Sequence, residues 1–122
     1  MQGGVAAKMG LVLDCADPEV LAAFWSAALG YTTLGGAGSY VLLVDEAKQR
    51  PKLLLQRVDE PKPGKNRMHL DIEADDVDAE VSRLEGLGGR RLEDPMEEHG
   101  SRWVVMADPE GNEFCVCTGT EW

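Results

Sequence analysis

Imidazole and carboxylate side chains occupy alternate positions of the segment 67–74, where apolar residues separate His69, Asp71 and Glu73. This alternation is typical of a β-strand with one buried face, so we expect these three side chains to share the other face. Together they could move protons, bind an organic cation or hold a metal ion.

Other expected strands should bring further polar side chains to the same kind of face. By the same alternation these are Asp14 in 9–15 and Gln56 in 52–58. In 113–118 they are Glu113 and Cys115, with Cys117 on the same face. Clustered carboxylates repel one another unless a cation arrives, so the predicted ligand is neutral or cationic. Trp103 begins another strand and is expected to offer an aromatic surface to that ligand.

Each candidate also has a purely structural interpretation. His69 is then a hydrogen-bonded residue with no role in binding, while Asp14 and Asp71 are acceptors for nearby turns. Cys115 is a small buried residue rather than a nucleophile, and Trp103 covers the core. The sequence leaves both interpretations open.

The elements around these side chains occur twice. Segments 13–30 and 68–89 each predict the end of a strand, an acidic turn, one helix and a closing glycine, and their comparison matches Asp14 with Asp71. Three further strands are expected after each helix. This duplication predicts an α+β fold of two βαβββ modules, with helices on the outer face of a curved, mixed or antiparallel sheet.

We expect all 122 residues to form one domain. The predicted first module covers 9–58, the linker 59–66 contains two prolines, and the second module covers 67–118. A glycine-rich loop is expected at 35–39 and an acidic loop at 93–100.

Helix starts are predicted at Asp17 and at Asp75 or Asp76, because aspartate is a strong N-cap residue. Apolar residues with helical spacing follow both, and they place Trp25 in the core and Leu87 at the end of the second stripe.

The formal net charge of −10 argues against nucleic acid or an anionic membrane as a partner. Three cysteines, none in CxxC spacing, do not indicate a disulfide scaffold. Neither a signal peptide nor a membrane span is expected, so the predicted location is the cytoplasm.

Three segments, LVLDCADPEVLAAFWSAALGY, HLDIEADDVDAEVSRLEGLG and WVVMADPEGNEFCV, resemble the vicinal oxygen chelate superfamily. It includes glyoxalase I, extradiol dioxygenases, fosfomycin-resistance enzymes and bleomycin-resistance proteins. The resemblance implies that each module curls into a half-barrel, that two half-barrels form a cup for a small-molecule ligand, and that the chain forms a homodimer.

Metal-using relatives place ligands on the first and last strands of each module. Carried over by resemblance, these positions are Gly10, Gln56, His69 and Cys115. Only the histidine matches, and glycine offers no ligand atom, so we expect no metal cofactor. If a divalent metal is bound, the resemblance assigns His69, Gln56 and Cys115 to it.

The predicted function is metal-independent binding of a small molecule, as in bleomycin-resistance proteins, with sequestration of a cationic or planar aromatic antibiotic or metabolite. One alternative is a metal-dependent, glyoxalase-like lyase or isomerase. Another is a metal-free enzyme with Asp71 or Glu73 as base and His69 as acid. The sequence does not decide whether a reaction is catalysed.

Overall fold

The structure, a computed structural model, describes residues 9–119. The chain divides into two compact units, with the boundary in the sequence between Pro61 and Lys62, and we call them the first and second modules. Each is described by itself.

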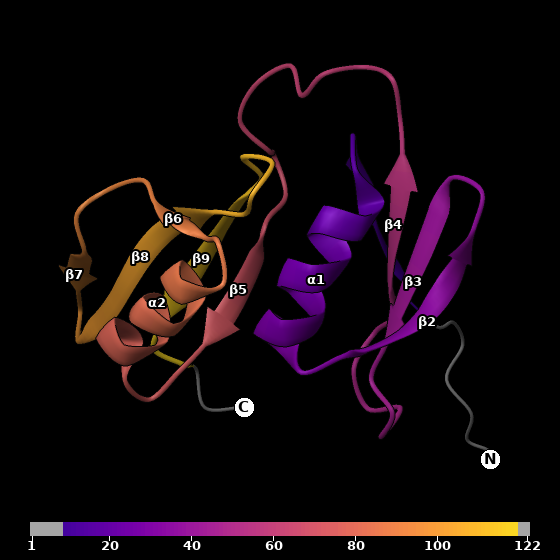
Figure 1. Ribbon diagram of the computed structural model, residues 1–122. Coiled ribbons are helices and arrows are strands. Elements are labelled where there is room, and N and C mark those ends of the chain that lie inside the picture. Colours follow the sequence, from indigo (N-terminus) through magenta and orange to yellow (C-terminus); the bar gives the residue numbers. More distant parts are fainter. Residues whose placement is uncertain (1–8, 120–122) are drawn as a thin grey trace, which may run out of the picture. The chain divides into compact units, whose positions relative to one another are not determined.

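The first module is a four-stranded sheet covered on one face by a helix (Figure 1). Its elements are β1 (Leu11–Cys15), α1 (Pro18–Leu29), β2 (Thr32–Ala37), β3 (Tyr40–Val44) and β4 (Leu53–Arg57). The strand order is β1-β4-β3-β2, in which β1 and β4 are parallel and the other pairs are antiparallel. The helix contacts β3 and β4.

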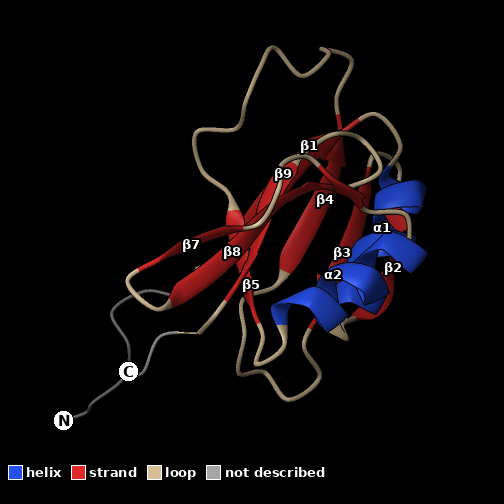
Figure 2. Cartoon of the chain, turned by 90° about the vertical axis from the view of Figure 1, so that its left-hand side faces the viewer, coloured by secondary structure: helices blue, strands red, loops and turns tan. Residues whose placement is uncertain are grey.

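The second module repeats this arrangement with one added strand (Figures 1 and 2). Its elements are β5 (Leu70–Glu73), α2 (Val77–Gly86), β6 (Arg90–Arg91), β7 (Met96–Glu98), β8 (Ser101–Ala107) and β9 (Glu113–Cys117). The order is β5-β9-β8-β6, with β5 and β9 parallel, and β7 pairs with β8. The predicted α+β class with two βαβββ-type modules is therefore confirmed.

Two predicted loops are partly strands. The acidic loop 93–100 contains β7, and β2 extends through Gly35 and Gly36 with an irregular register after Thr33. A Cβ atom on Gly36 would lie 1.9 Å from the carbonyl oxygen of Tyr40, so this close strand approach requires glycine. In the sequence these glycines indicated a turn, but in the structure the glycines permit a bulged strand.

Both helices begin at an aspartate N-cap. Asp17 accepts hydrogen bonds from the backbone N–H groups of Glu19 and Val20, and Asp76 accepts one from Ala79. Matching the two caps offsets the modules by 59 residues, so Asp14 corresponds to Glu73 rather than to Asp71. The sequence comparison of these strands was wrong by two residues, a shift that alternation alone cannot detect.

The core of each module lies between its helix and one sheet face. Trp25 is 2% exposed and packs edge-on against Phe24 with 5.1 Å between ring centroids, as predicted for a core residue. In α2 the buried residues are Val77, Val81 and Leu84. Leu87 lies beyond the last helical residue and is 38% exposed, so its predicted place in the buried stripe is wrong.

Strand alternation is confirmed in both modules. Leu53 and Leu55 of β4, and Phe114 and Val116 of β9, are buried beneath the helices. The residues between them are less buried and lie on the opposite side, which we call the open face of each module. Among the described residues, no helix is long and apolar enough to cross a membrane.

Candidate functional site

Two rows of paired residues cross the open face of the second module. One row is Asp71–Cys115–Val105, and the other is Glu73–Cys117–Trp103. Directly paired residues on neighbouring strands point to the same side, so each row shares one surface. The strands therefore bring together four of the predicted site residues, Asp71, Glu73, Trp103 and Cys115.

His69 immediately precedes β5, and its side chain lies beside Asp71 of the first row. Its Nε2 atom lies 3.5 Å from Oδ1 of Asp71, and the two side chains are 40% and 55% exposed. One ligand atom from each of His69, Asp71 and Cys115 lies within 4.8 Å of the others. These three side chains could converge on a Zn²⁺ ion as nitrogen, oxygen and sulfur ligands, or serve as an acid–base group.

The two thiols on this face resist ionisation. Burial, followed by the charge of Asp71, raises the pKa of Cys115, with Lys65 acting in the opposite direction. Burial and the charges of Asp71 and Glu73 raise the pKa of Cys117 to about 11. Both thiols are therefore protonated near neutral pH, which makes them poor nucleophiles and leaves the carboxylates as the negative groups of the face.

Glu113 is engaged within its own module. Its carboxylate accepts a 2.9 Å hydrogen bond from the backbone N–H of Asn66 and lies 3.1 Å from Nζ of Lys62. The hydrogen bond from Asn66, opposed by desolvation and aided by Lys62, lowers the pKa of Glu113. The side chain thus anchors the segment before β5, a contact between distant residues that no local pattern signals.

The open face of the first module has the corresponding rows Val12–Leu54–Leu42 and Asp14–Gln56–Tyr40. The structure therefore places Asp14 and Gln56 side by side, in a row with Tyr40. Because Val12 corresponds to Asp71, the residue that corresponds to Cys115 is Leu54 rather than Gln56. Neither row of this module contains a histidine or cysteine.

Gly10 corresponds to His69 under the same matching of helix caps. A Cβ atom at Gly10 would lie 3.3 Å from Cε of Lys52, so the aliphatic part of a lysine covers this position. The sequence predicted that Gly10 lacks a ligand atom, but it did not predict the neighbouring cationic side chain. Strand alternation also predicted Cys117 on the same face as Cys115, but it was not among the candidate site residues.

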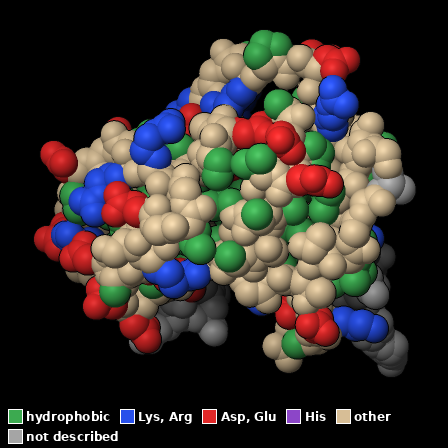
Figure 3. Space-filling model, in the orientation of Figure 1, with side chains coloured by type: hydrophobic (Ala, Val, Ile, Leu, Met, Phe, Trp, Pro, Cys, Tyr) green, Lys and Arg blue, Asp and Glu red, His purple; other side chains and the backbone are tan. Residues whose placement is uncertain are grey.

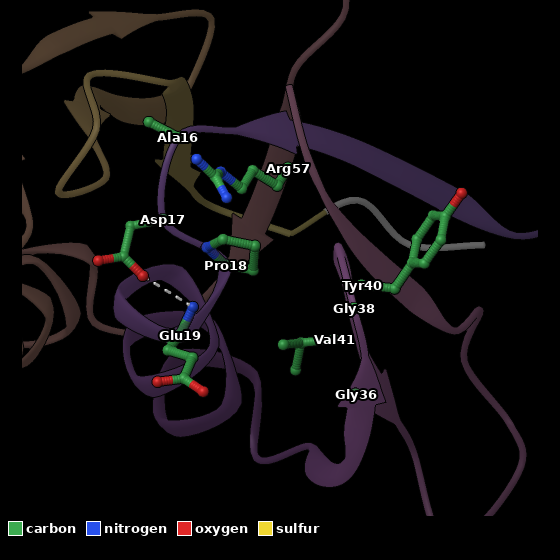
Figure 4. A pocket seen from close by; sticks show the side chains of 9 residues that line it. All are labelled: Ala16, Asp17, Pro18, Glu19, Gly36, Gly38, Tyr40, Val41 and Arg57. Atoms are coloured by element: carbon green, nitrogen blue, oxygen red, sulfur yellow. Dashed lines mark hydrogen bonds between the residues drawn. The ribbon is translucent and has the colours of Figure 1, made fainter. Parts of the chain in front are cut away.

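A depression of about 580 Å³ lies elsewhere in the first module, beside the start of α1 (Figure 4). In Figure 4, Val41 points toward α1 and the ring of Tyr40 points away from it. The depression is lined by Ala16, Asp17, Pro18, Glu19, Gly36, Gly38, Tyr40, Val41 and Arg57. None of the predicted site residues is among them.

On the α2 side of the second module, acidic and basic side chains are interspersed (Figure 3). Arg102 lies 2.9 Å from Asp78 and 3.1 Å from Glu97, for example. On the open face, by contrast, the side chain of Glu73 makes no hydrogen bond or ion pair within residues 9–119. Charge neutralisation is therefore incomplete on the face that carries the candidate site.

Comparisons with known proteins agree with this architecture. A family model described as a glyoxalase-like domain matches residues 10–117. A lactoylglutathione lyase from Agrobacterium tumefaciens is similar at 27% identity, with a TM-score of 0.67 over 95% of this chain and 96% of that chain. A comparison with curated proteins finds no match.

Two further solved structures show the same fold. A glyoxalase/bleomycin resistance protein/dioxygenase family enzyme from Burkholderia phytofirmans has a TM-score of 0.75 at 16% identity, covering 88% of this chain and 94% of that one. The fosfomycin resistance protein FosX from Mesorhizobium loti has a TM-score of 0.73 at 15% identity, covering 96% and 95%. The chain belongs to the glyoxalase-like domain family, within the vicinal oxygen chelate superfamily of glyoxalases, bleomycin-resistance proteins and dioxygenases.

Proposed function

We propose that this protein binds an organic cation on the open face of its second module and does so without a metal ion. The observation that carries the proposal is the polarity of the two rows, in which exposed Asp71 and Glu73 lie beside protonated thiols and apolar residues. Carboxylates attract the positive group of a ligand, while Val105 and Trp103 supply apolar contact for its body.

Metal independence is supported by the first module. At the two positions where the family's metal ligands would lie, this module offers Gly10 and Leu54, which have no ligand atoms. The lysine side chain beside Gly10 adds a positive charge that would repel a metal ion at this position of the first module. By analogy with the bleomycin-resistance members of the superfamily, we propose that binding sequesters an antibiotic or metabolite.

Isothermal titration with cationic and planar polycyclic compounds tests this function. We expect micromolar or tighter binding for an amphipathic cation, and about tenfold weaker binding for Asp71→Asn, a change of about 1.4 kcal/mol. Val12→Asn, at the corresponding position of the first module, is the matched control and should leave the affinity unchanged. A panel without any binder would contradict the proposal.

A second candidate function is a metal-dependent, glyoxalase-like lyase or isomerase. The proximity of ligand atoms from His69, Asp71 and Cys115 favours it, because three protein ligands with one open position are typical of catalytic zinc. The His69–Asp71 contact also favours a metal-free acid–base enzyme. Stoichiometric zinc, nickel, manganese or iron in the purified protein, removed by His69→Ala, would support the metal-dependent enzyme over metal-free binding.

Two further expectations remain proposals. We propose a homodimer on the basis of the family alone, and sedimentation velocity of the full chain would show a single monomeric species if this is wrong. We propose a cytoplasmic location because the three cysteines are free thiols in the structure.

A further inference from the structure

The row Glu73–Cys117–Trp103, which continues to Met96 of β7, has a carboxylate at its β5 end, then a small side chain and then an indole. Glu73 pairs with Cys117 between β5 and β9, and Cys117 pairs with Trp103 between β9 and β8. Two strand spacings separate Glu73 from Trp103 by about 9.5 Å at their Cα atoms. The carboxylate and the indole therefore flank the thiol on one surface.

Glu73 is a carboxylate without a cationic partner. It is exposed, and within residues 9–119 its side chain has no hydrogen bond or ion pair. The chain after β9 passes close to it, since a Cβ atom at Gly119 would lie 2.9 Å from Oε1 of Glu73. A side chain at position 119 would therefore crowd this carboxylate.

Trp103 lies on the other side of Cys117 in the row. It is partly buried, and within the described residues no hydrogen bond, cation or second ring engages its indole. The face of an indole attracts a cation more strongly than the other aromatic side chains do. An indole and a carboxylate facing the same space form a suitable environment for one positive charge.

The middle residue distinguishes this row from its counterpart in the first module. There, Gln56 lies between Asp14 and Tyr40, and its amide side chain is longer than that of a cysteine. Cys117 is shorter and lacks strong hydrogen-bonding groups. A ligand group can therefore approach the second row where the glutamine would exclude it.

We propose that Glu73, Cys117 and Trp103 form a subsite for an alkylated ammonium group, and that Cys117 limits the size of the group that enters. This deepens the proposed binding of an organic cation and rests on it. A primary ammonium group has three N–H donors, but the row offers only one strong acceptor, Glu73. A quaternary ammonium group has no N–H to satisfy and binds through charge and contact with the indole.

Isothermal titration of the full chain with benzyltrimethylammonium tests the subsite, with its uncharged isostere neopentylbenzene for comparison. We expect the cation to bind and the isostere to bind at least tenfold more weakly. Glu73→Gln and Trp103→Leu should each weaken binding of the cation about tenfold, whereas Trp103→Phe should retain part of the affinity because it keeps an aromatic face.

Two matched variants test the role of the middle residue. Cys117→Gln, which copies the first module, should abolish binding, whereas Cys117→Ala should preserve it. Asp14→Asn, at the position that corresponds to Glu73, should have no effect. Thermal unfolding of each variant checks that the fold is intact, and Cys117→Leu, which also lengthens the middle side chain and should weaken binding, replaces the glutamine variant if that variant does not fold.

Equal affinity of wild type and a folded Glu73→Gln variant for benzyltrimethylammonium would overturn the subsite. So would equal binding of the cation and the neutral isostere. If the chain binds another organic cation but not benzyltrimethylammonium, the subsite is wrong and the proposed function stands. Failure to bind any cation would overturn both.

Discussion

In the first module the row that starts from β1 is Val12–Leu54–Leu42, whereas the corresponding row of the second module is Asp71–Cys115–Val105. The strand order, the parallel pair and the aspartate cap are the same in both modules. Polarity therefore changes at positions that the helix-facing core does not use. One scaffold can carry an apolar row in one copy and, at the corresponding position, a row with a carboxylate and a thiol in the other.

The largest expected effect concerns the shared scaffold. Trp25→Ala in the first module should lower the free energy of unfolding by about 3–5 kcal/mol, and Leu84→Ala in the second by about 2–5 kcal/mol, because each leaves a cavity beneath its helix. Val12→Ala, at a position 59% exposed, should change it by less than about 0.5 kcal/mol. Urea denaturation measures all three. A negligible effect of Leu84→Ala would mean that the second module lacks an equivalent core.

The next difference between the modules is the irregular register of β2 in the first module. Gly36→Ala should destabilise the protein by about 1–3 kcal/mol or more, because the added methyl group overlaps the carbonyl oxygen of Tyr40. Gly64→Ala is the matched control, since a Cβ atom there meets nothing within 4 Å. Equal midpoints of thermal unfolding for the two variants would argue against the close approach of β2 and β3.

The helix caps should respond similarly in the two modules. Asp17→Ala and Asp76→Ala should each cost about 1 kcal/mol, because each leaves helix N–H groups without an acceptor. The loss should be at least as large at Asp17, which accepts two hydrogen bonds where Asp76 accepts one. Asp17→Asn and Asp76→Asn should restore most of the stability. Denaturant midpoints that do not respond to either alanine would contradict the matching of the modules at these caps.

The smallest effect depends on pH. Glu113 has a lowered pKa in the folded state, so its contribution is present above the unfolded pKa of about 4.3 and is lost as pH falls through the folded value. Glu113→Gln should therefore cost up to about 1 kcal/mol at pH 7 and progressively less in acid. Lys52→Gln, at the corresponding position immediately before β4, should lack this acid dependence. A constant difference between wild type and Glu113→Gln from pH 7 to pH 3 would contradict the contact with Lys62 and Asn66.

Local patterns in the sequence were sufficient to predict much of the scaffold. Helix caps, apolar spacing and strand alternation depend on neighbouring residues, and they identified both modules, the burial of Trp25 and the open faces. Strand β7 escaped prediction because it gains its stability from pairing with β8, not from its own acidic sequence.

The candidate site could be predicted only in part, because register is a property of the folded sheet. Alternation placed Asp71 and Cys115 on one face, but only cross-strand pairing shows that they are direct neighbours. The same pairing assigns Leu54, rather than Gln56, to the position that corresponds to Cys115. Long-range contacts such as that of Glu113 with Asn66 leave no local signal.

The affinity for an amphipathic organic cation, measured by isothermal titration before and after exhaustive treatment with EDTA, tests metal-independent binding most directly. The charge of Asp71 and Glu73 beside apolar residues predicts the same dissociation constant in both samples and weaker binding by Asp71→Asn. Loss of binding after EDTA, with recovery when one equivalent of zinc is added, would contradict the proposed function.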